Sequence, residues 1–198
     1  MKFKLLGTEI YISFLFSALI AFMIATDRTG LCIPTLFAAF IHETGHLLAL
    51  WACDCQPKAI RLIPASVQIV RGFSKKRHGE AAISLCGPMA NLVVFLALFI
   101  NYSITKSEES LRFGLLNMIL CVFNLLPVPP LDGSRILAAF LPGRMIFAYY
   151  RYQNYIMLGL FALLFLGVLD TPLAWLRSIM WDGLGRIADL PFKAFGVF

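Results

Sequence analysis

The sequence is poor in charge. Only 14% of its 198 residues are Asp, Glu, Lys or Arg, while 60% are hydrophobic. Soluble globular chains carry about a quarter charged residues, so this composition excludes a water-soluble domain. The uncharged runs approach the roughly 20 residues that a helix needs to cross a bilayer. They predict five membrane-spanning helices, near Glu9–Thr26, Leu31–Ala52, Ala82–Ile100, Leu111–Val128 and Tyr149–Leu169.

Internal repeats and low-complexity tracts are also absent, which excludes a solenoid or an extended disordered tail. We therefore expect an all-α polytopic membrane protein that forms one membrane-embedded domain over residues 1–198, with its core in residues 10–140. Residues 141–198 would add a span and an amphipathic C-terminal segment. Within that segment, residues 172–190 form either a sixth span or a helix lying in the membrane interface.

Cysteine is scarce and odd in number, with five residues that lie mostly inside the predicted spans. This excludes a disulfide-rich secreted scaffold and indicates a reducing compartment. The excess of basic residues, a net charge of +6, is sorted by loop rather than pooled in one patch. Basic residues precede the first span and separate spans two from three and four from five. This alternation predicts a cytoplasmic N-terminus and gives no reason to expect nucleic acid as a partner.

Histidine is scarcer still: the chain has three, and two stand in the run Ile41–Leu47. His42 and His46 are four residues apart, so on a helix their imidazoles lie on one face and can hold one Zn²⁺. Glu43 stands beside the first histidine, where its carboxylate can act as a general base on a water molecule at the metal. Such groups are costly inside an apolar helix without a function. The spacing predicts an intramembrane zinc site.

A catalytic zinc needs a third protein ligand, and two residues are candidates. His78 lies in the basic run Lys75-Lys76-Arg77, where positive charge disfavours a cation. Asp132 follows three prolines in the run from Pro127 to Pro130, which must end the fourth span and unwind the chain near the membrane face. Asp132 is the ligand we expect. The alternative is an ordinary loop carboxylate that caps the helix starting near Gly133-Ser134.

Two β-prone runs follow the histidine segment, Ala59–Pro64 and Val67–Arg71. They predict a strand pair at the membrane surface, with a plain cytoplasmic loop as the alternative. The residues Val67, Gln68, Ile69 and Val70 would form an edge that pairs with an extended substrate. Further along, Gly87-Pro88 predicts a break or kink in the third span. Asn91 needs a hydrogen-bond partner or a wet cavity, and a structural bond between helices explains it equally well.

Together these segments resemble the site-2 protease family of intramembrane zinc metalloproteases. Three motifs carry the resemblance in the family's order and spacing, namely His42 to His46, Gly87-Pro88 with Asn91, and Asn124 through Pro127 to Asp132-Gly133. The compact layout is most similar to the bacterial branch that processes a sporulation sigma-factor precursor. The chain departs from the family in having Ala65-Ser66 where Gly-Gly is frequent, and in lacking the PDZ insertion and the regulatory C-terminal domain of particular branches.

The resemblance implies a zinc ion bound by His42, His46 and Asp132, with Glu43 activating water. It also implies that Asn124, and with it Asn91, supports the substrate or its oxyanion. The expected activity is cleavage of a transmembrane or membrane-associated protein substrate, within the lipid bilayer of a bacterial cell membrane. A regulatory partner is compatible with this activity.

Two other functions compete with this one. An intramembrane metal transporter or channel would also use His and Asp, but would carry polar residues along several spans rather than in one cluster. A catalytically inactive relative that binds membrane proteins would not need Glu43 and all three ligand residues, which this sequence keeps.

Overall fold

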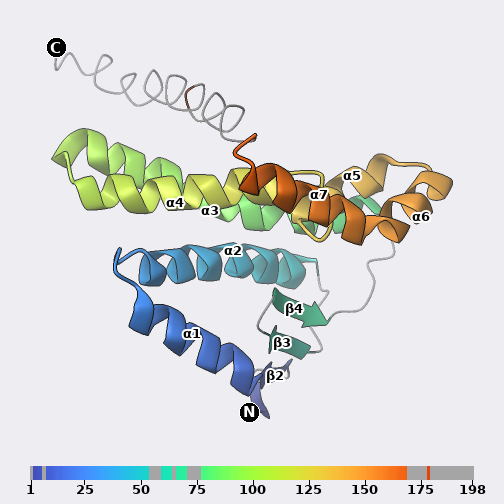
Figure 1. The fold of residues 1–198 in the computed structure, drawn as a ribbon, viewed down its shortest axis with the longest axis horizontal. Helices are drawn as coiled ribbons and strands as arrows, with labels where there is room; N and C mark the ends of the chain where they lie inside the picture. The colour runs from blue at the N-terminus through green and yellow to red at the C-terminus, as the bar shows by residue number, and fades with distance from the viewer. Residues whose placement is uncertain are drawn as a thin grey trace.

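The structure is a computed structural model, and it describes residues 2–5, 8–53, 59–63, 66–70, 77–168 and 178. This part of the chain contains seven helices and four strands, and the last five elements are all helices (Figure 1). In order they are β1 (Lys2–Leu5), β2 (Thr8–Ile12), α1 (Phe14–Thr26), α2 (Cys32–Ala52), β3 (Ala59–Ile63), β4 (Ser66–Val70), α3 (Arg77–Thr105), α4 (Glu108–Leu125), α5 (Asp132–Phe140), α6 (Gly143–Arg151) and α7 (Gln153–Phe165). The segment 172–190, predicted as a sixth span or an interfacial helix, lies outside the described residues except for Ser178.

Helix α3 is the centre of the fold, because α2, α4 and α5 all pack against it. The core is small and apolar, with Phe95 and Phe99 of α3 enclosed together with Met118 of α4. Glycine allows the closest approach of α2 to α3, since a Cβ at Gly45 would lie 2.5 Å from the backbone oxygen of Cys86. The helix that carries the histidine motif is therefore held tightly against α3.

The outer helices present apolar side chains instead of burying them. Neither α1 nor α7 has a buried residue, and Phe14 and Phe165 are 87% and 95% exposed. By length and hydropathy, two helices of the described part could cross a bilayer, Cys32–Ala52 and Gly79–Thr105. The shorter apolar helices are α1 and α7, with 13 residues each.

A four-stranded sheet replaces part of the predicted helical structure. Its order is β1-β2-β3-β4, with β2 and β3 parallel and the other two pairs antiparallel. Strands β3 and β4 fall in the segment where the sequence predicted a strand pair, and Gln68 is in register with Arg61. The first predicted span was wrong at its start, because Glu9 to Ile12 belong to β2 and the helix begins at Phe14. The alternation in Thr-Glu-Ile-Tyr-Ile suits a strand, and β1 and β3 supply its partners.

Three further sequence-based boundaries need correction. Of the break or kink predicted at Gly87-Pro88, the break was wrong, since α3 runs from Arg77 to Thr105 with Pro88 inside it. Pro88 is fully buried, so packing on both sides holds the helix together where one internal hydrogen bond is lost. The fifth span is divided at Tyr152, where α6 ends and α7 begins. The connection after the fourth span also contains a helix that the sequence reading missed, α5.

Candidate metal centre

Helix α2 brings the two histidines together. His42 and His46 are one turn apart on the buried face of α2, and only 6% and 8% of their surfaces are exposed. Their rings meet edge to face, with 4.7 Å between centroids, and the two Nε2 atoms lie 3.1 Å apart. An apolar helix has placed two nitrogen donors at one point, as the i, i+4 spacing predicts.

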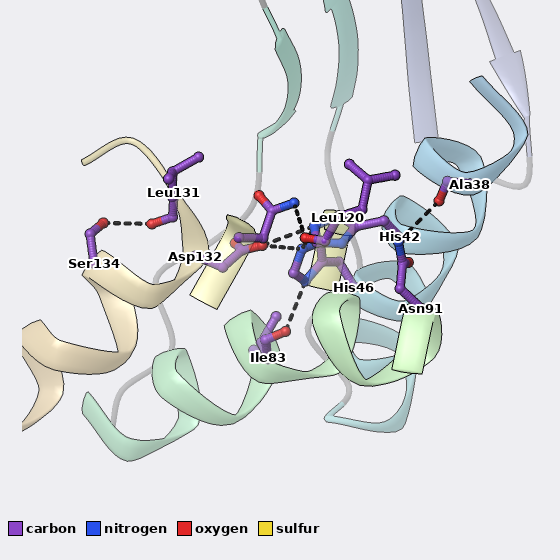
Figure 2. Close-up of polar contacts among 10 residues, drawn as sticks. Ala38, His42, His46, Ile83, Asn91, Leu120, Leu131, Asp132 and Ser134 are labelled. Carbon is purple, nitrogen blue, oxygen red and sulfur yellow. Dashed lines mark hydrogen bonds and ion pairs between the residues drawn. The ribbon is translucent and has the colours of Figure 1, made fainter. Parts of the chain in front are cut away.

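Asp132 completes a three-atom cluster from the other side (Figure 2). Its Oδ2 lies 2.9 Å from Nε2 of His42 and 3.1 Å from Nε2 of His46. Helix α4 ends at Leu125, the proline-rich segment turns back, and Asp132 is the first residue of α5. The three residues form a group whose donor atoms all lie within 4.8 Å of one another.

The start of α5 is fixed by several contacts near Asp132. Ser134 donates its hydroxyl hydrogen bond to the carbonyl of Leu131 at 2.6 Å, and Tyr149 of α6 donates to the carbonyl of Pro127 at 2.7 Å. Gly133 is buried where any Cβ would overlap the backbone oxygen of Leu125. The loop therefore presents Asp132 in a defined place, although α5 begins there rather than after an extended loop.

The second nitrogen of His46 determines its tautomer. Nδ1 of His46 donates a hydrogen bond to the backbone carbonyl of Ile83 on α3, at 2.9 Å (Figure 2). This assignment leaves the lone pair on Nε2, the atom that faces Asp132. Nδ1 of His42 is buried and has no hydrogen-bond partner in the described part of the chain. The carbonyl of Ile83 was not foreseen, since a backbone acceptor leaves no signal in the sequence.

The charges of the cluster are complementary. Burial raises the pKa of Asp132, but its hydrogen bonds with His42 and His46 outweigh burial and lower the pKa to about 2. Asp132 is therefore a carboxylate over the whole physiological range, the form that binds a cation. Glu43 is partly buried on the same turn of α2, close enough to feel the charges of His42, His46 and Asp132. Its carboxylate has no hydrogen-bond partner among the described residues.

The other predicted site residues lie in different surroundings. Asn91 is fully buried, its Nδ2 makes a long 3.5 Å contact with the carbonyl of Ala38 on α2, and its Oδ1 has no partner in the described structure. Asn124 is half-buried near the end of α4 and donates to the carbonyl of Leu120 in its own helix, at 3.0 Å. Val67, Gln68, Ile69 and Val70 lie in β4, whose backbone pairs with β3. The structure thus brings His42, His46 and Asp132 together, and among the described residues neither asparagine forms a hydrogen bond with them.

Comparison with known proteins now bears on this geometry. The sequence pattern of peptidase family M50 matches residues 110–167, which include Asp132. A zinc metalloprotease of Methanocaldococcus jannaschii is 27% identical over 152 residues, 70% of this chain and 44% of that protein. A Bacillus subtilis protein, named provisionally as a zinc metalloprotease, is 30% identical over 139 residues, 63% of this chain and 60% of that protein. By these matches the chain is similar to zinc metalloproteases of peptidase family M50.

A solved site-2 protease from Methanocaldococcus jannaschii has the same fold. It superposes with a TM-score of 0.63 over 94% of both chains, at 24% sequence identity. The matches reach only 44% and 60% of the length of the two curated relatives. The resemblance predicted from the three motifs is confirmed, and two helices of the described part are long and apolar enough to cross a bilayer.

Proposed function

We propose that this protein is a zinc-dependent intramembrane endopeptidase that cleaves a membrane-associated protein. The observation that carries the proposal is the triangle of Nε2 of His42, Nε2 of His46 and Oδ2 of Asp132, with sides of 2.9 to 3.1 Å. Three acceptor atoms, on two buried histidines and a half-buried aspartate, do not converge so closely without a shared cation or proton between them. The names of the curated relatives, zinc metalloproteases, support zinc as that cation.

The donor set fits zinc in number, chemistry and size. Around a tetrahedral zinc with bonds of about 2.0–2.1 Å, ligand atoms lie about 3.3 Å apart. The triangle needs to widen by only a few tenths of an ångström to reach that value. Two imidazoles and one carboxylate also match the ligand number of a catalytic site, which keeps a further position open. His42, His46 and Asp132 would hold one zinc ion per chain.

Glu43 is the general base of the proposed reaction. Zinc, when bound, supplies Lewis-acid polarisation of water and of the scissile carbonyl. Glu43 takes the proton from the attacking water and returns it to the departing amine, which needs a carboxylate without a competing hydrogen bond. His46 keeps its ring oriented through Ile83, so the lone pair of Nε2 does not turn away during the reaction.

The substrate would bind in an extended form along β4. A helical substrate hides its carbonyls in internal hydrogen bonds, so it must be unwound before water can attack. Among the described strands β4 has one neighbour, β3, and its other edge is available for a further strand. The edge comprises Val67, Gln68, Ile69 and Val70. In this proposal Asn124 is the better oxyanion donor than Asn91, because it is half-buried and a rotamer change would free its amide.

The proposed membrane topology includes more helices than the two that are long enough to cross a bilayer by themselves. We propose that α1, α4 and the α6–α7 unit complete five spans of a single domain in a bacterial cell membrane, with a cytoplasmic N-terminus and the strand pair at the membrane surface. Helices α1 and α7 are short, so they would cross a locally thinned bilayer. In this topology α2 and α4 both run inward and deliver His46 and Asp132 to the cytoplasmic side.

The test is to measure zinc and proteolysis on the same preparations. We expect one zinc per wild-type chain by elemental analysis, and loss of both zinc and cleavage in His46→Ala and Asp132→Ala. His78→Ala, which removes the third histidine of the chain, is the matched control and should keep both. The substrate would be identified as the membrane protein that accumulates uncut in cells carrying Glu43→Gln. Full zinc occupancy and intact cleavage in His46→Ala would refute the ligand assignment.

A further inference from the structure

Helix α3 carries none of the three proposed ligands, yet its backbone lies directly against both imidazoles of the site. A Cβ built on Gly87 would overlap Nε2 of His46, lie 2.5 Å from Cε1 of the same ring, and lie 2.9 Å from Cε1 of His42. These are the ring edges that carry the two nitrogens facing Asp132. Any side chain at position 87 would occupy the space that the rings now fill.

The same face of α3 also contacts His46 one turn earlier. Ile83 precedes Gly87 by four residues, so the two lie on one face of the helix. The carbonyl of Ile83 accepts the hydrogen bond from Nδ1 of His46 at 2.9 Å, while Gly87 lies against the adjoining Cε1–Nε2 edge of the ring. The backbone of α3 thus contacts the imidazole at Nδ1 and along the adjoining Cε1–Nε2 edge, in the tautomer that leaves the lone pair on Nε2.

The packing of α3 itself does not require glycine at this position. Glycine weakens the interior of a helix, because it loses more backbone freedom on folding than any other residue. The neighbouring contact between α2 and α3 is already provided by Gly45, whose absent Cβ makes room for Cys86 and Ala90. The three atoms nearest to a Cβ on Gly87 all belong to the histidine pair.

We propose that Gly87 is a positioning residue for the metal site: its bare backbone is the surface that directs both Nε2 atoms toward Asp132. The proposal rests on the proposed zinc site, since the atoms it orients are the proposed ligands. It assigns α3 a role in setting metal affinity without contributing a donor atom. A methyl group at this position should displace the rings rather than α3, since rings at the end of rotatable bonds move more easily than packed backbone.

The experiment compares Gly87→Ala with Gly159→Ala, whose added Cβ meets nothing within 4 Å. In the purified full-length protein we expect Gly87→Ala to bind zinc 10 to 100 times more weakly, the range found for residues that orient ligands. The Co²⁺-substituted protein should show altered d–d bands, which report the geometry at the metal. Gly159→Ala should match the wild type in both. Unchanged zinc affinity and an unchanged cobalt spectrum in Gly87→Ala would overturn the proposal.

A double-mutant cycle on the zinc-free protein tests the contact independently of the metal. Gly87→Ala should lower Tm by about 4 °C in the wild-type background, as overpacking does. It should lower Tm by less than half as much in the His46→Ala background, where the two nearest ring atoms are gone. If Gly87→Ala lowers Tm equally in both backgrounds, or prevents folding in both, the added methyl group clashes with something other than His46. Either result would overturn the proposal. A wild-type chain that binds no zinc would refute the proposed function, while the cycle would still decide whether Gly87 holds the rings.

Discussion

Gly133→Ala should damage the metal site without touching any proposed ligand. A Cβ at Gly133 would overlap the backbone oxygen of Leu125 and lie 2.5 Å from both the carbonyl carbon of Leu125 and the oxygen of Leu126. Ordinary contact begins at 3.4 Å, so the start of α5 must move by at least 3.4 − 2.5 = 0.9 Å, and by more to clear the oxygen of Leu125. All three atoms belong to the backbone, so no flexible side chain can absorb the shift. Asp132, the preceding residue, moves with it.

A displacement of this size exceeds the tolerance of a metal site, where bond lengths hold to within about 0.2 Å. A misplacement of about 1 Å can cost about 10²-fold in rate. We therefore expect Gly133→Ala to lose zinc in competition with a chelator and to cleave about 10²-fold more slowly, with unchanged helicity by circular dichroism. Gly159→Ala, in open space on α7, is the control. If Gly133→Ala holds zinc as tightly as the wild type, the start of α5 does not determine the position of Asp132, and the reasoning is refuted.

Three further predictions concern the sheet, the membrane and the helix start. Proline substitutions at Gln68 and at Ile69 test the two edges of β4 one at a time, because the N–H groups of neighbouring residues in a strand point in opposite directions. One variant should lose cleavage with zinc retained, and two normally cleaving variants would exclude this edge as the docking site. Cysteines introduced at the exposed positions Glu108 and Arg144 should label from opposite sides of the membrane, and labelling from one side would refute the topology. Hydrogen bonds to Asp27 from the backbone of Cys32 and from Thr29 lower its pKa, so its support for the start of α2 is present above the unfolded pKa of about 3.9 and is lost as pH falls below it. Asp27→Asn should therefore lower Tm more at pH 7 than at pH 3, and equal losses at both would refute this.

The site was more predictable than the fold around it. His42 and His46 are placed by helix periodicity alone, because one apolar run fixes both secondary structure and face. Asp132 could be inferred because prolines must end α4, which leaves one carboxylate at the same end of the bundle as the histidines. The single sequence could not show that this carboxylate begins a helix, α5, since the local composition of the segment is that of a loop.

The errors share a physical cause, which is that tertiary partners override local pattern. Strand β2 was read as part of a helix because its apolar residues continue into α1, and only pairing with β1 and β3 makes it a strand. Pro88 was expected to interrupt α3, but burial against neighbouring helices preserves it. The contacts of Ile83 and Gly87 with the rings involve backbone, and no side-chain pattern could have identified them.

The most direct test of the central claim is the zinc content and the cleavage rate of one Glu43→Gln preparation. The amide keeps the shape of the carboxylate but cannot accept the proton of water, and it lies outside the proposed ligand set. We expect one zinc per chain, as in the wild type, together with cleavage reduced by about 10²–10⁴-fold. Cleavage at the wild-type rate by a zinc-loaded Glu43→Gln protein would contradict the assignment of Glu43 as the base, and with it the proposed mechanism.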